Sequence, residues 1–249
     1  MSRRRLLAVG ACTVLLSLDA SAQTFATPPD LSGAWAPYRG GRGADPALMP
    51  PPAGPILLKS PYNEAYRARR AAEEEATKRG EPLGTAAALC TPYGMPRMMS
   101  VALYPVEILH RPGQITIITE AFSEVRRIYM NQPQLPIAGV APGFYGHSVG
   151  RWDGDTLVVD TVAIKESVLS YQNLPHSDQM RIIERFRLVT NDILHDQITI
   201  DDPVVLEKPV VYTLAYRRLP GYKMVEFVCE NNREYIDESG RVRMKVRDK

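Results

Sequence analysis

The sequence is poor in the residues from which metal centres are usually built. Its 249 residues include three cysteines and four histidines, and none of them stand in a Cys-x-x-Cys, His-x-His or His-x-x-x-His spacing. Such short spacings are the usual sign that two ligands share one metal ion. We therefore expect no metal site. The alternative is a site made of His147, His176 and Glu120, which lie far apart in the chain.

The sequence also lacks a run that could span a membrane. Residues 6–18 are mostly apolar, but a transmembrane helix needs about 20 such residues. This run follows three arginines at positions 3–5 and precedes Ala-Ser-Ala at positions 20–22, which is the pattern of a cleavable signal peptide. We expect cleavage after Ala22 and a periplasmic or secreted protein without membrane insertion. The arginines also allow export by the twin-arginine route.

An excess of charge of either sign is absent from the expected mature chain. The full sequence has a formal net charge of +2, but residues 1–22 contain three arginines and one aspartate. Their removal leaves equal numbers of basic and acidic residues. Nucleic-acid binding has no electrostatic support, because it depends on an excess of Lys and Arg. We expect a small-molecule partner and no nucleic acid.

Two cysteines remain after the signal peptide, Cys90 and Cys229. In an oxidising compartment, two cysteines without other partners favour a disulfide bond. The bond would close a long loop, and this closure is worth about 4–5 kcal/mol in the chain-entropy description. The alternative is two unrelated buried thiols.

The expected mature chain, residues 23–249, has the length of one domain with three parts. Residues 23–59 are rich in proline and glycine and predict an irregular segment with a short strand near residues 28–35. Residues 60–80 predict a helix, with Ser60 as N-cap, Pro61 at the first helical position and Gly80 as the stop. Its narrow apolar stripe places this helix on the surface.

Residues 106–230 have the pattern of short strands joined by turns. Strand-like runs flank the turn sequences at residues 111–113, 153–155, 190–192 and 219–221, and the last of these turns would join residues 210–218 to residues 222–230. Consecutive hairpins predict an antiparallel meander of about eight or nine strands. Such a sheet loses its edges by closing on itself. We predict a mainly β, lipocalin-like barrel, closed or curled, with one N-terminal surface helix.

Several motifs in the chain occur together in a known group of proteins. They are CTPYGMPRMM at residues 90–99, RRIY at 126–129, GHSVGRWDGDTLVVDT at 146–161, PHSD at 175–178 and VCEN at 228–231. In these motifs the sequence resembles a family of exported β-rich proteins of Gram-negative bacteria, and the resemblance covers most of the mature chain. It implies a periplasmic or secreted protein, and its matches at Cys90 and Cys229 support the disulfide. It implies no particular reaction.

The segment GHSVG at residues 146–150 fits the G-x-S-x-G pattern of serine hydrolases, with Ser148 as the nucleophile. That pattern requires a strand, a tight turn and then a helix whose N-terminus faces the oxyanion. Here the hairpin turn signal Asp153-Gly154-Asp155 follows, so no helix can start. We therefore interpret Ser148 as a residue that contacts the substrate or supports the site.

Acid–base chemistry has better candidates than nucleophilic catalysis. His147 and His176 each stand beside a serine where a loop meets a strand, and histidine titrates near neutral pH. We predict both as catalytic residues, with Glu120 orienting one of them. The alternative is a structural role for each.

Other polar residues lie in strand patterns that would place some of them inside the barrel, where they would line a polar cavity. The alternative for the charged residues is pairing on the outer face of the sheet. The segment at residues 92–99 is rich in methionine, whose side chains adapt to apolar ligands, so it could form a flexible lid at the mouth of the barrel. The alternative is a loop that packs its methionines under the sheet. The predicted substrate-binding residues are Arg127 and Tyr129, which would bind or polarise an oxyanion, and Ser148, Glu184, Tyr145 and Met98.

Two functions fit these features. The leading hypothesis is an exported enzyme, independent of metals and organic cofactors, that acts by acid–base chemistry (lyase, isomerase or hydrolase) on a small, partly apolar or aromatic molecule in the barrel cavity. The alternative is a non-catalytic, lipocalin-like binding protein that uses the same cavity. The enzyme requires at least two titratable groups within reach of one substrate, whereas the binding protein does not.

Overall fold

The fold is given by a computed structural model, which describes residues 27–40, 44–80, 90–100, 104–166, 168, 171–227, 234–239 and 242–244. The expected signal peptide and Cys229 lie outside these ranges. Export and the disulfide between Cys90 and Cys229 therefore remain predictions.

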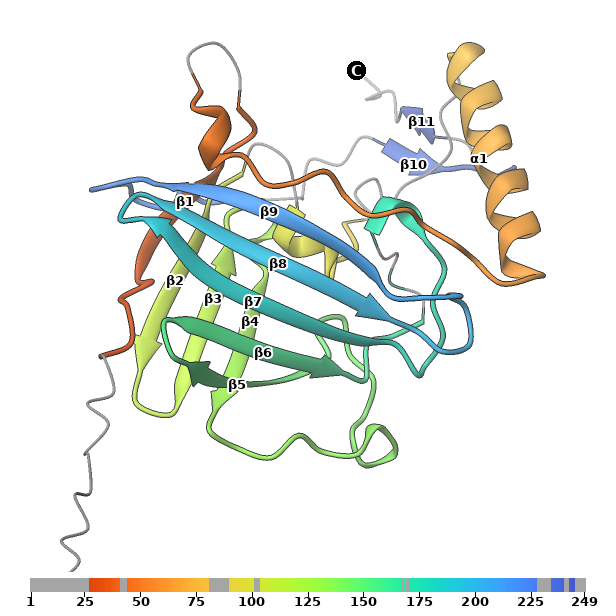
Figure 1. Ribbon diagram of the computed structural model, residues 1–249. Coiled ribbons are helices and arrows are strands. Elements are labelled where there is room, and N and C mark those ends of the chain that lie inside the picture. Colours follow the sequence, from red (N-terminus) through yellow and green to blue (C-terminus); the bar gives the residue numbers. More distant parts are fainter. Residues whose placement is uncertain are drawn as a thin grey trace, which may run out of the picture.

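The protein is built around a closed barrel of nine strands (Figure 1). The predicted mainly β barrel with a helix outside it is confirmed. In chain order the barrel strands are β1 (Gly33–Pro37), β2 (Val106–Arg111), β3 (Gln114–Thr119), β4 (Val125–Met130), β5 (His147–Asp153), β6 (Thr156–Val162), β7 (Arg181–Thr190), β8 (Ile193–Asp201) and β9 (Val210–Arg218).

The remaining elements are not strands of the barrel wall. They are helix α1 (Tyr62–Lys78) and a two-stranded sheet of β10 (Glu234–Ile236) and β11 (Val242–Met244). Short 3-10 turns occur at η1 (Pro46–Leu48), η3 (Arg97–Ser100), η4 (Ala121–Ser123), η5 (Ile137–Gly139) and η6 (Tyr171–Asn173).

Neighbouring strands of the barrel are antiparallel except β4 and β5, which are parallel. This exception to the predicted meander follows from the odd number of strands. Going once around a closed ring, the strand direction reverses at each antiparallel pair and must return to its starting value. The number of antiparallel pairs is therefore even, and a ring of nine strands needs at least one parallel pair. The long connection at residues 131–146 makes that pair possible, because parallel neighbours need a crossover.

Strand β1 closes the barrel. The prediction of a strand at residues 222–230 is wrong for residues 222–227, the part that the structure describes. β1 pairs with β2 on one side and with β9 on the other, where Trp35 is opposite Arg218. The Arg218 guanidinium lies 4.1 Å from the centroid of the Trp35 ring, and its Nη1 donates to the carbonyl oxygen of Ser32 at 2.7 Å. Because β1 occupies this edge of β9, residues 222–227 run outside the sheet.

The predicted hairpin around residues 153–155 is confirmed as β5 and β6. Gly154 has a φ of +62°, the left-handed conformation that such a turn requires. Asp153 and Asp155 accept hydrogen bonds from Arg185 and Arg187 on β7, at 3.1 and 3.3 Å. The turn is therefore held by cations of the next strand. It also excludes a strand–turn–helix elbow at Ser148, which lies inside β5.

Helix α1 lies at the side of the barrel and is largely exposed (Figure 1). Within the helix, Ala76 is the buried residue. The hydroxyl group of Tyr66 donates to the carbonyl oxygen of Gln172 at 3.1 Å, which ties the helix to the loop before β7. The predicted cap at Ser60 is wrong, because the helix starts one residue later: Pro61 is the N-cap, and no side chain caps the first turn.

The methionine-rich segment packs into the core, as in the second of the two predicted arrangements. Met95, Met98 and Met99 are all buried. Glu124, just before β4, holds the segment by accepting hydrogen bonds from the backbone N–H groups of residues 93 and 94. The Glu124 carboxylate fixes two backbone groups of the segment, and the three methionines are buried. The segment is therefore a part of the barrel core.

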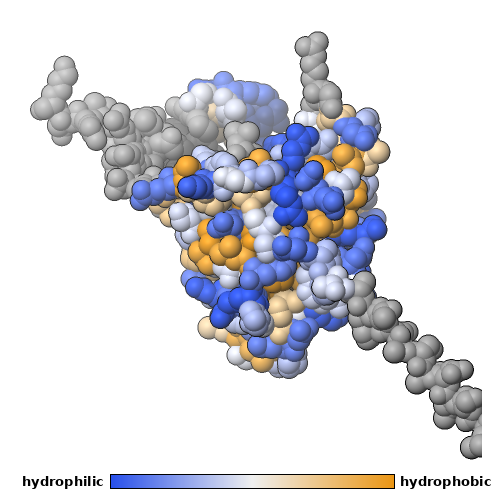
Figure 2. Space-filling model, turned by 90° about the vertical axis from the view of Figure 1, so that its left-hand side faces the viewer, coloured by the Kyte–Doolittle hydropathy of each residue, from blue (hydrophilic) through white to orange (hydrophobic). Residues whose placement is uncertain are grey.

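The surface mixes polar and apolar residues. On the face in Figure 2, hydrophobic patches are separated by hydrophilic side chains. None of the helices in the described ranges combines the length and the apolar character that crossing a bilayer demands.

Candidate functional site

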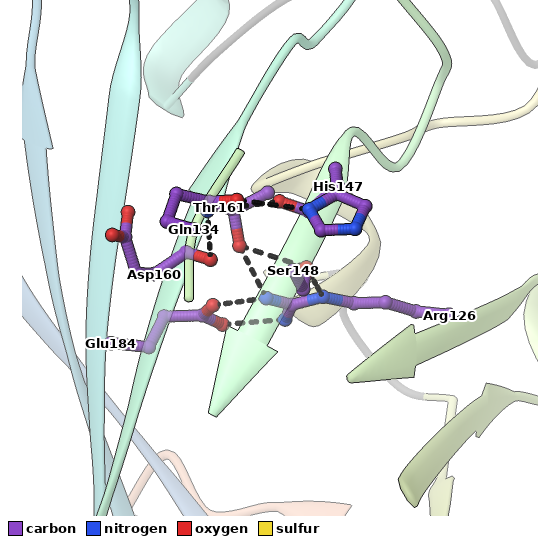
Figure 3. A network of polar contacts seen from close by, with 7 residues as sticks. All are labelled: Arg126, Gln134, His147, Ser148, Asp160, Thr161 and Glu184. Carbon is purple, nitrogen blue, oxygen red and sulfur yellow. Dashed lines mark hydrogen bonds and ion pairs between the residues drawn. The ribbon is translucent and has the colours of Figure 1, made fainter. Parts of the chain in front are cut away.

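A buried ion pair joins β4 to β7 inside the barrel (Figure 3). The side chains of Arg126 and Glu184 are both fully buried. Nη1 of Arg126 donates to Oε1 of Glu184 at 2.8 Å, and Nη2 donates to Oε2, so the contact is bidentate. Buried charges need such close and geometrically matched partners, because the interior solvates them poorly.

Two hydroxyl groups on the strands between β4 and β7 complete the network. Nε of Arg126 donates to Oγ of Ser148 at 3.1 Å, and Nη2 donates to Oγ1 of Thr161 at 2.9 Å. The two hydroxyl oxygens are themselves 2.9 Å apart and share a hydrogen bond. These four side chains, Arg126, Ser148, Thr161 and Glu184, form the paired network. All four are buried and hydrogen-bonded, and their formal charges cancel.

The register of the sheet explains why these side chains meet. Residues of a strand point alternately to the two faces, and Arg126 is in phase with Ile128 and Met130, which belong to the core. Ser148 is opposite Ile128 in the parallel pair and opposite Thr161 in the hairpin. The parallel pairing of β4 with β5 therefore positions the Arg126 guanidinium beside the two hydroxyls.

Beside the paired network lie two buried polar groups without hydrogen-bond partners. Both carboxyl oxygens of Asp196 and the hydroxyl oxygen of Tyr212 are unbonded in the described structure. The two residues are 0% and 4% exposed. A buried polar group without a partner costs about 1–3 kcal/mol, so each one calls for an explanation. Asp196 and Tyr212 are referred to below as the unpaired groups.

The two unpaired groups and the network occupy neighbouring positions on the inner face. Glu184 on β7 and Tyr212 on β9 are both opposite Ile198 on β8. Asp196 is two residues from Ile198 along β8, so it is a diagonal neighbour of both. Diagonal neighbours in a sheet lie about 7–8 Å apart, within reach of long side chains. A single ligand group could therefore contact both unpaired side chains.

The environment of Asp196 favours its neutral form. Burial raises the pKa of the Asp196 carboxyl well above its ordinary value, and the charge of Glu184 raises it further, whereas Arg126 opposes the effect. The charge of Arg126 is already compensated by Glu184, so it offers Asp196 little stabilisation. Burial also raises the pKa of the Tyr212 and Tyr216 hydroxyls well above the ordinary value, with the charge of Asp196 acting in the same direction.

A surface pocket adjoins the inner face at the edge of β9. β1 pairs with β9 only from Tyr216 to Arg218, so the earlier part of β9 has no strand neighbour on that side. A cavity of about 320 Å³ lies there, which is at the lower end of the range for small-molecule sites. Its lining includes Leu214, which is opposite Asp196 on β8. Tyr216, which also lines the pocket, donates its hydroxyl to the carbonyl oxygen of Met99 at 2.5 Å.

Three of the predicted site residues lie on the outer face of the barrel. His147 precedes the inward-facing Ser148 and therefore points outward, where its Nδ1 is 2.9 Å from Oε1 of Gln134 (Figure 3). Its ring stacks on Tyr129 at a centroid distance of 5.5 Å. Arg127 is exposed and shares the outer face of β4 with Tyr129. The sheet separates all three from the paired network.

His176 is buried, and both of its ring nitrogens face backbone carbonyl oxygens. Nδ1 is 2.8 Å from the oxygen of Ser177, and Nε2 is 2.8 Å from the oxygen of Val168. The N–H and the hydroxyl of Ser177 donate to Asp202 at 2.6 and 2.9 Å. With both nitrogens engaged, His176 holds together the loop before β7.

Glu120 lies in a third place, after β3. Its Oε2 accepts hydrogen bonds from the Tyr222 hydroxyl at 2.6 Å and from the backbone N–H of Val225 at 3.1 Å. No contact in the described part of the chain joins Glu120 to His147 or His176, so the predicted catalytic trio is not brought together. Nor do the described residues contain any group of three or more His, Cys, Asp or Glu side chains placed to hold a metal ion.

The other predicted residues divide between the core and the paired network. Tyr145 packs against the core, and burial, with the charge of Glu124, raises the pKa of its hydroxyl to about 12. Met98 is a buried core residue. Ser148 and Glu184 are the two predicted residues that the structure brings together, and Arg126 is the side chain that joins them.

Four residues of the site were not predicted: Arg126, Thr161, Asp196 and Tyr212. Arg126 is the neighbour of the predicted Arg127 in the motif RRIY, so the two differ by one step of strand alternation. The sequence contains a signal for Asp196, because Leu194, Asp196 and Ile198 are alternate residues of one strand and therefore face the same side. The signal is weak, because the residues next to Asp196 are polar as well.

Comparison with known proteins identifies no family for this chain. No family model and no curated protein matches it. Among solved structures, the chain is similar to one described as "REP1-NXSQ fatty acid transporter", with 14% sequence identity, a TM-score of 0.35, and coverage of 77% of this chain and 98% of that chain. At this distance the similarity gives no information about a ligand, so function is argued from the site alone.

Proposed function

We propose that this protein is an exported, non-catalytic barrel that binds a small molecule at the unpaired groups. The observation that carries the proposal is the presence of Asp196 and Tyr212, buried and without hydrogen-bond partners, in an otherwise apolar and paired interior. A ligand whose polar group bonds to them removes a cost of about 1–3 kcal/mol for each unpaired group. The surrounding core residues bury the apolar part of the same ligand.

Binding is favoured over acid–base catalysis by the position of the titratable groups. An acid–base enzyme needs two such groups that can exchange protons with one substrate near neutral pH. His147 points outward, and both nitrogens of His176 are engaged. At the unpaired groups, Asp196 would have to act with Tyr212, and burial raises the pKa of the Tyr212 hydroxyl, which makes it a poor acid or base.

The pocket at the edge of β9 provides the route for the ligand. Leu214 lines the pocket and is opposite Asp196. The neighbouring wall is made by Met49 and Met99, and methionine side chains adapt readily to a passing apolar molecule. Export rests on the signal-peptide pattern of residues 1–22 and on the resemblance to exported Gram-negative proteins.

The proposal is tested by purifying the mature protein from the periplasm and identifying bound small molecules by native mass spectrometry. We expect a ligand in stoichiometric amount with the wild type and its loss from the Asp196→Val variant. The matched control is Asp201→Asn, which changes an exposed carboxyl on the same strand. If the wild type and Asp196→Val retain the same molecule equally, or if no molecule binds, the proposal is wrong.

A further inference from the structure

The unpaired groups also indicate which kind of ligand fits. We infer that the ligand is an amine that binds in its protonated form, with the ammonium group between Asp196 and Tyr212. This inference rests on the proposed function and narrows it to one chemical class. It follows from the number of unbonded atoms, from the charges that face them and from the aromatic rings around them.

The number of unbonded atoms matches an ammonium group. The described structure leaves three buried side-chain oxygen atoms without partners: the two carboxyl oxygens of Asp196 and the hydroxyl oxygen of Tyr212. All three can accept hydrogen bonds, and a primary ammonium group offers three donors. An alcohol offers one donor, so it could engage all three atoms only by also accepting hydrogen bonds from the Tyr212 hydroxyl and from a protonated Asp196.

The charges that face the site exclude an anion and suit a cation. The charged groups around Asp196 are Glu184 on β7 and Arg126 on β4, and Arg126 is held by Glu184 in a bidentate pair. A carboxylate ligand would therefore meet two acidic side chains and no uncompensated cation among the described inner residues. With Asp196 ionised, the three side chains carry one excess negative charge, which a monocation neutralises.

Aromatic rings surround the same position. Tyr171 stacks on Tyr212, with ring centroids 3.9 Å apart and an interplanar angle of 13°. Phe186, on β7, is opposite Asp196. Tyr216, on β9, is two residues from Leu214, which is opposite Asp196 on its other side. The face of an aromatic ring attracts cations. Aromatic walls also suit an amine with an apolar or aromatic body.

Binding of the protonated amine has a defined proton balance. Burial disfavours the charged form of Asp196 in the ligand-free barrel, and on this inference its carboxyl holds a proton there. The ammonium group keeps its own protons and replaces that proton as the partner of the carboxylate. One proton therefore leaves Asp196 for the buffer with each amine bound. A neutral ligand, in contrast, would bond to the carboxylic acid and release no proton.

The test compares three ligands that share one body and differ in the polar group: 2-phenylethylamine, 2-phenylethanol and phenylacetate. Isothermal titration calorimetry with the mature protein at pH 7, in two buffers of different ionisation enthalpy, gives both affinity and proton release. We expect the amine to bind at least about tenfold more tightly than the other two and to release about one proton. Asp196→Asn is expected to abolish the preference and the proton release, and Asp201→Asn to retain both.

The possible outcomes separate this inference from the proposed function. If the alcohol or the carboxylate binds as tightly as the amine, or if the amine binds without proton release, the amine inference is wrong. If none of the three binds while a co-purified molecule does, the amine inference fails and the binding function stands. If neither the probes nor any co-purified molecule binds, both fail. Circular dichroism of Asp196→Asn confirms that any loss of binding occurs in a folded barrel.

Discussion

The paired network and the unpaired groups occupy the same inner wall but differ in hydrogen bonding. The network contains a full ion pair, yet every charged oxygen in it has a donor. Asp196 is a diagonal neighbour of Glu184, and Tyr212 is opposite Ile198, yet the side-chain oxygens of Asp196 and Tyr212 have no donor. The comparison shows that a polar residue inside a barrel is not by itself a sign of function. Whether its hydrogen bonds are already satisfied is the better criterion.

The largest expected effect comes from breaking the paired network. Arg126→Met leaves the carboxylate of Glu184 buried without a cation, and removal of one partner of a buried pair costs about 3–5 kcal/mol. Urea unfolding of the purified variant measures this loss.

A double variant, Arg126→Met with Glu184→Leu, is the control. It removes both charges and is expected to recover most of the stability, because apolar residues often replace buried ion pairs at little cost. A double variant as unstable as the single one would show that shape, and not the uncompensated charge, determines the loss.

A smaller effect distinguishes a bonded hydroxyl from an unbonded one. Thr161→Val keeps the shape of the side chain but removes an acceptor of Arg126, and loss of a hydrogen bond to a charged group costs about 1.5–3 kcal/mol. Tyr212→Phe removes a buried hydroxyl without a partner and is expected to raise the unfolding free energy by about 1–3 kcal/mol. Equal losses in the two variants would show that Tyr212 has a partner in solution.

The fold could be predicted from the sequence as far as local signals reach. The hairpin turns at residues 111–113, 153–155 and 190–192 depend on a few neighbouring residues, and all three join the strands expected. The sequence predicts a short strand near residues 28–35, which overlaps β1, but it does not predict that this strand closes the barrel, because the pairing of Trp35 with Arg218 joins opposite ends of the chain. The turn sequence at residues 219–221 predicts a hairpin, but the edge of β9 that its second strand would need is occupied by β1.

The site was less predictable than the fold. The sequence predicts Ser148 and Glu184 as substrate-binding residues, and the structure brings them together inside the barrel, but the arginine that joins them is Arg126 and not Arg127. Alternation alone gives two possible phases, and the pairing with β3 and β5 determines which one is realised. His147 is predicted as a catalytic residue because it is titratable and stands in a motif, yet its neighbour Ser148 faces inward, so His147 faces outward.

Removal of the unpaired carboxyl is expected to stabilise the ligand-free barrel. Asp196→Val replaces a buried, unbonded group with an apolar residue suited to a strand, for a gain of about 1–3 kcal/mol. The same variant loses the ligand, so stability and binding change in opposite directions. Thermal unfolding and native mass spectrometry measure the two properties on one sample. A loss of stability would mean that Asp196 serves the fold.

The same carboxyl gives a pH dependence of known sign. Burial raises the pKa of Asp196 in the folded state, so the folded protein holds a proton that the unfolded chain has released once the pH exceeds the ordinary value of 3.8. Stability therefore falls as pH rises from there toward the folded pKa, by at most about 1.4 kcal/mol per pH unit.

Asp196→Asn removes this contribution, and the difference between the two proteins isolates it. Glu124, whose pKa burial also raises, contributes equally to both proteins and cancels. Urea midpoints between pH 4 and pH 8 measure the difference. Parallel curves for the wild type and Asp196→Asn would show that the carboxyl is ionised in the folded state.

The smallest expected effect concerns the outer face and tests the contrast between the two sides of the wall. His147→Ala removes a ring that touches Gln134 and Tyr129 and none of the inner residues. We expect the affinity for the bound small molecule to remain within about twofold of the wild type, because the sheet separates His147 from Asp196. Calorimetric titration measures that affinity, and His147→Gln, which retains a hydrogen-bonding side chain, is the matched control. A tenfold loss in His147→Ala that His147→Gln restores would place the binding site on the outer face, and the inner unpaired groups would then need another explanation.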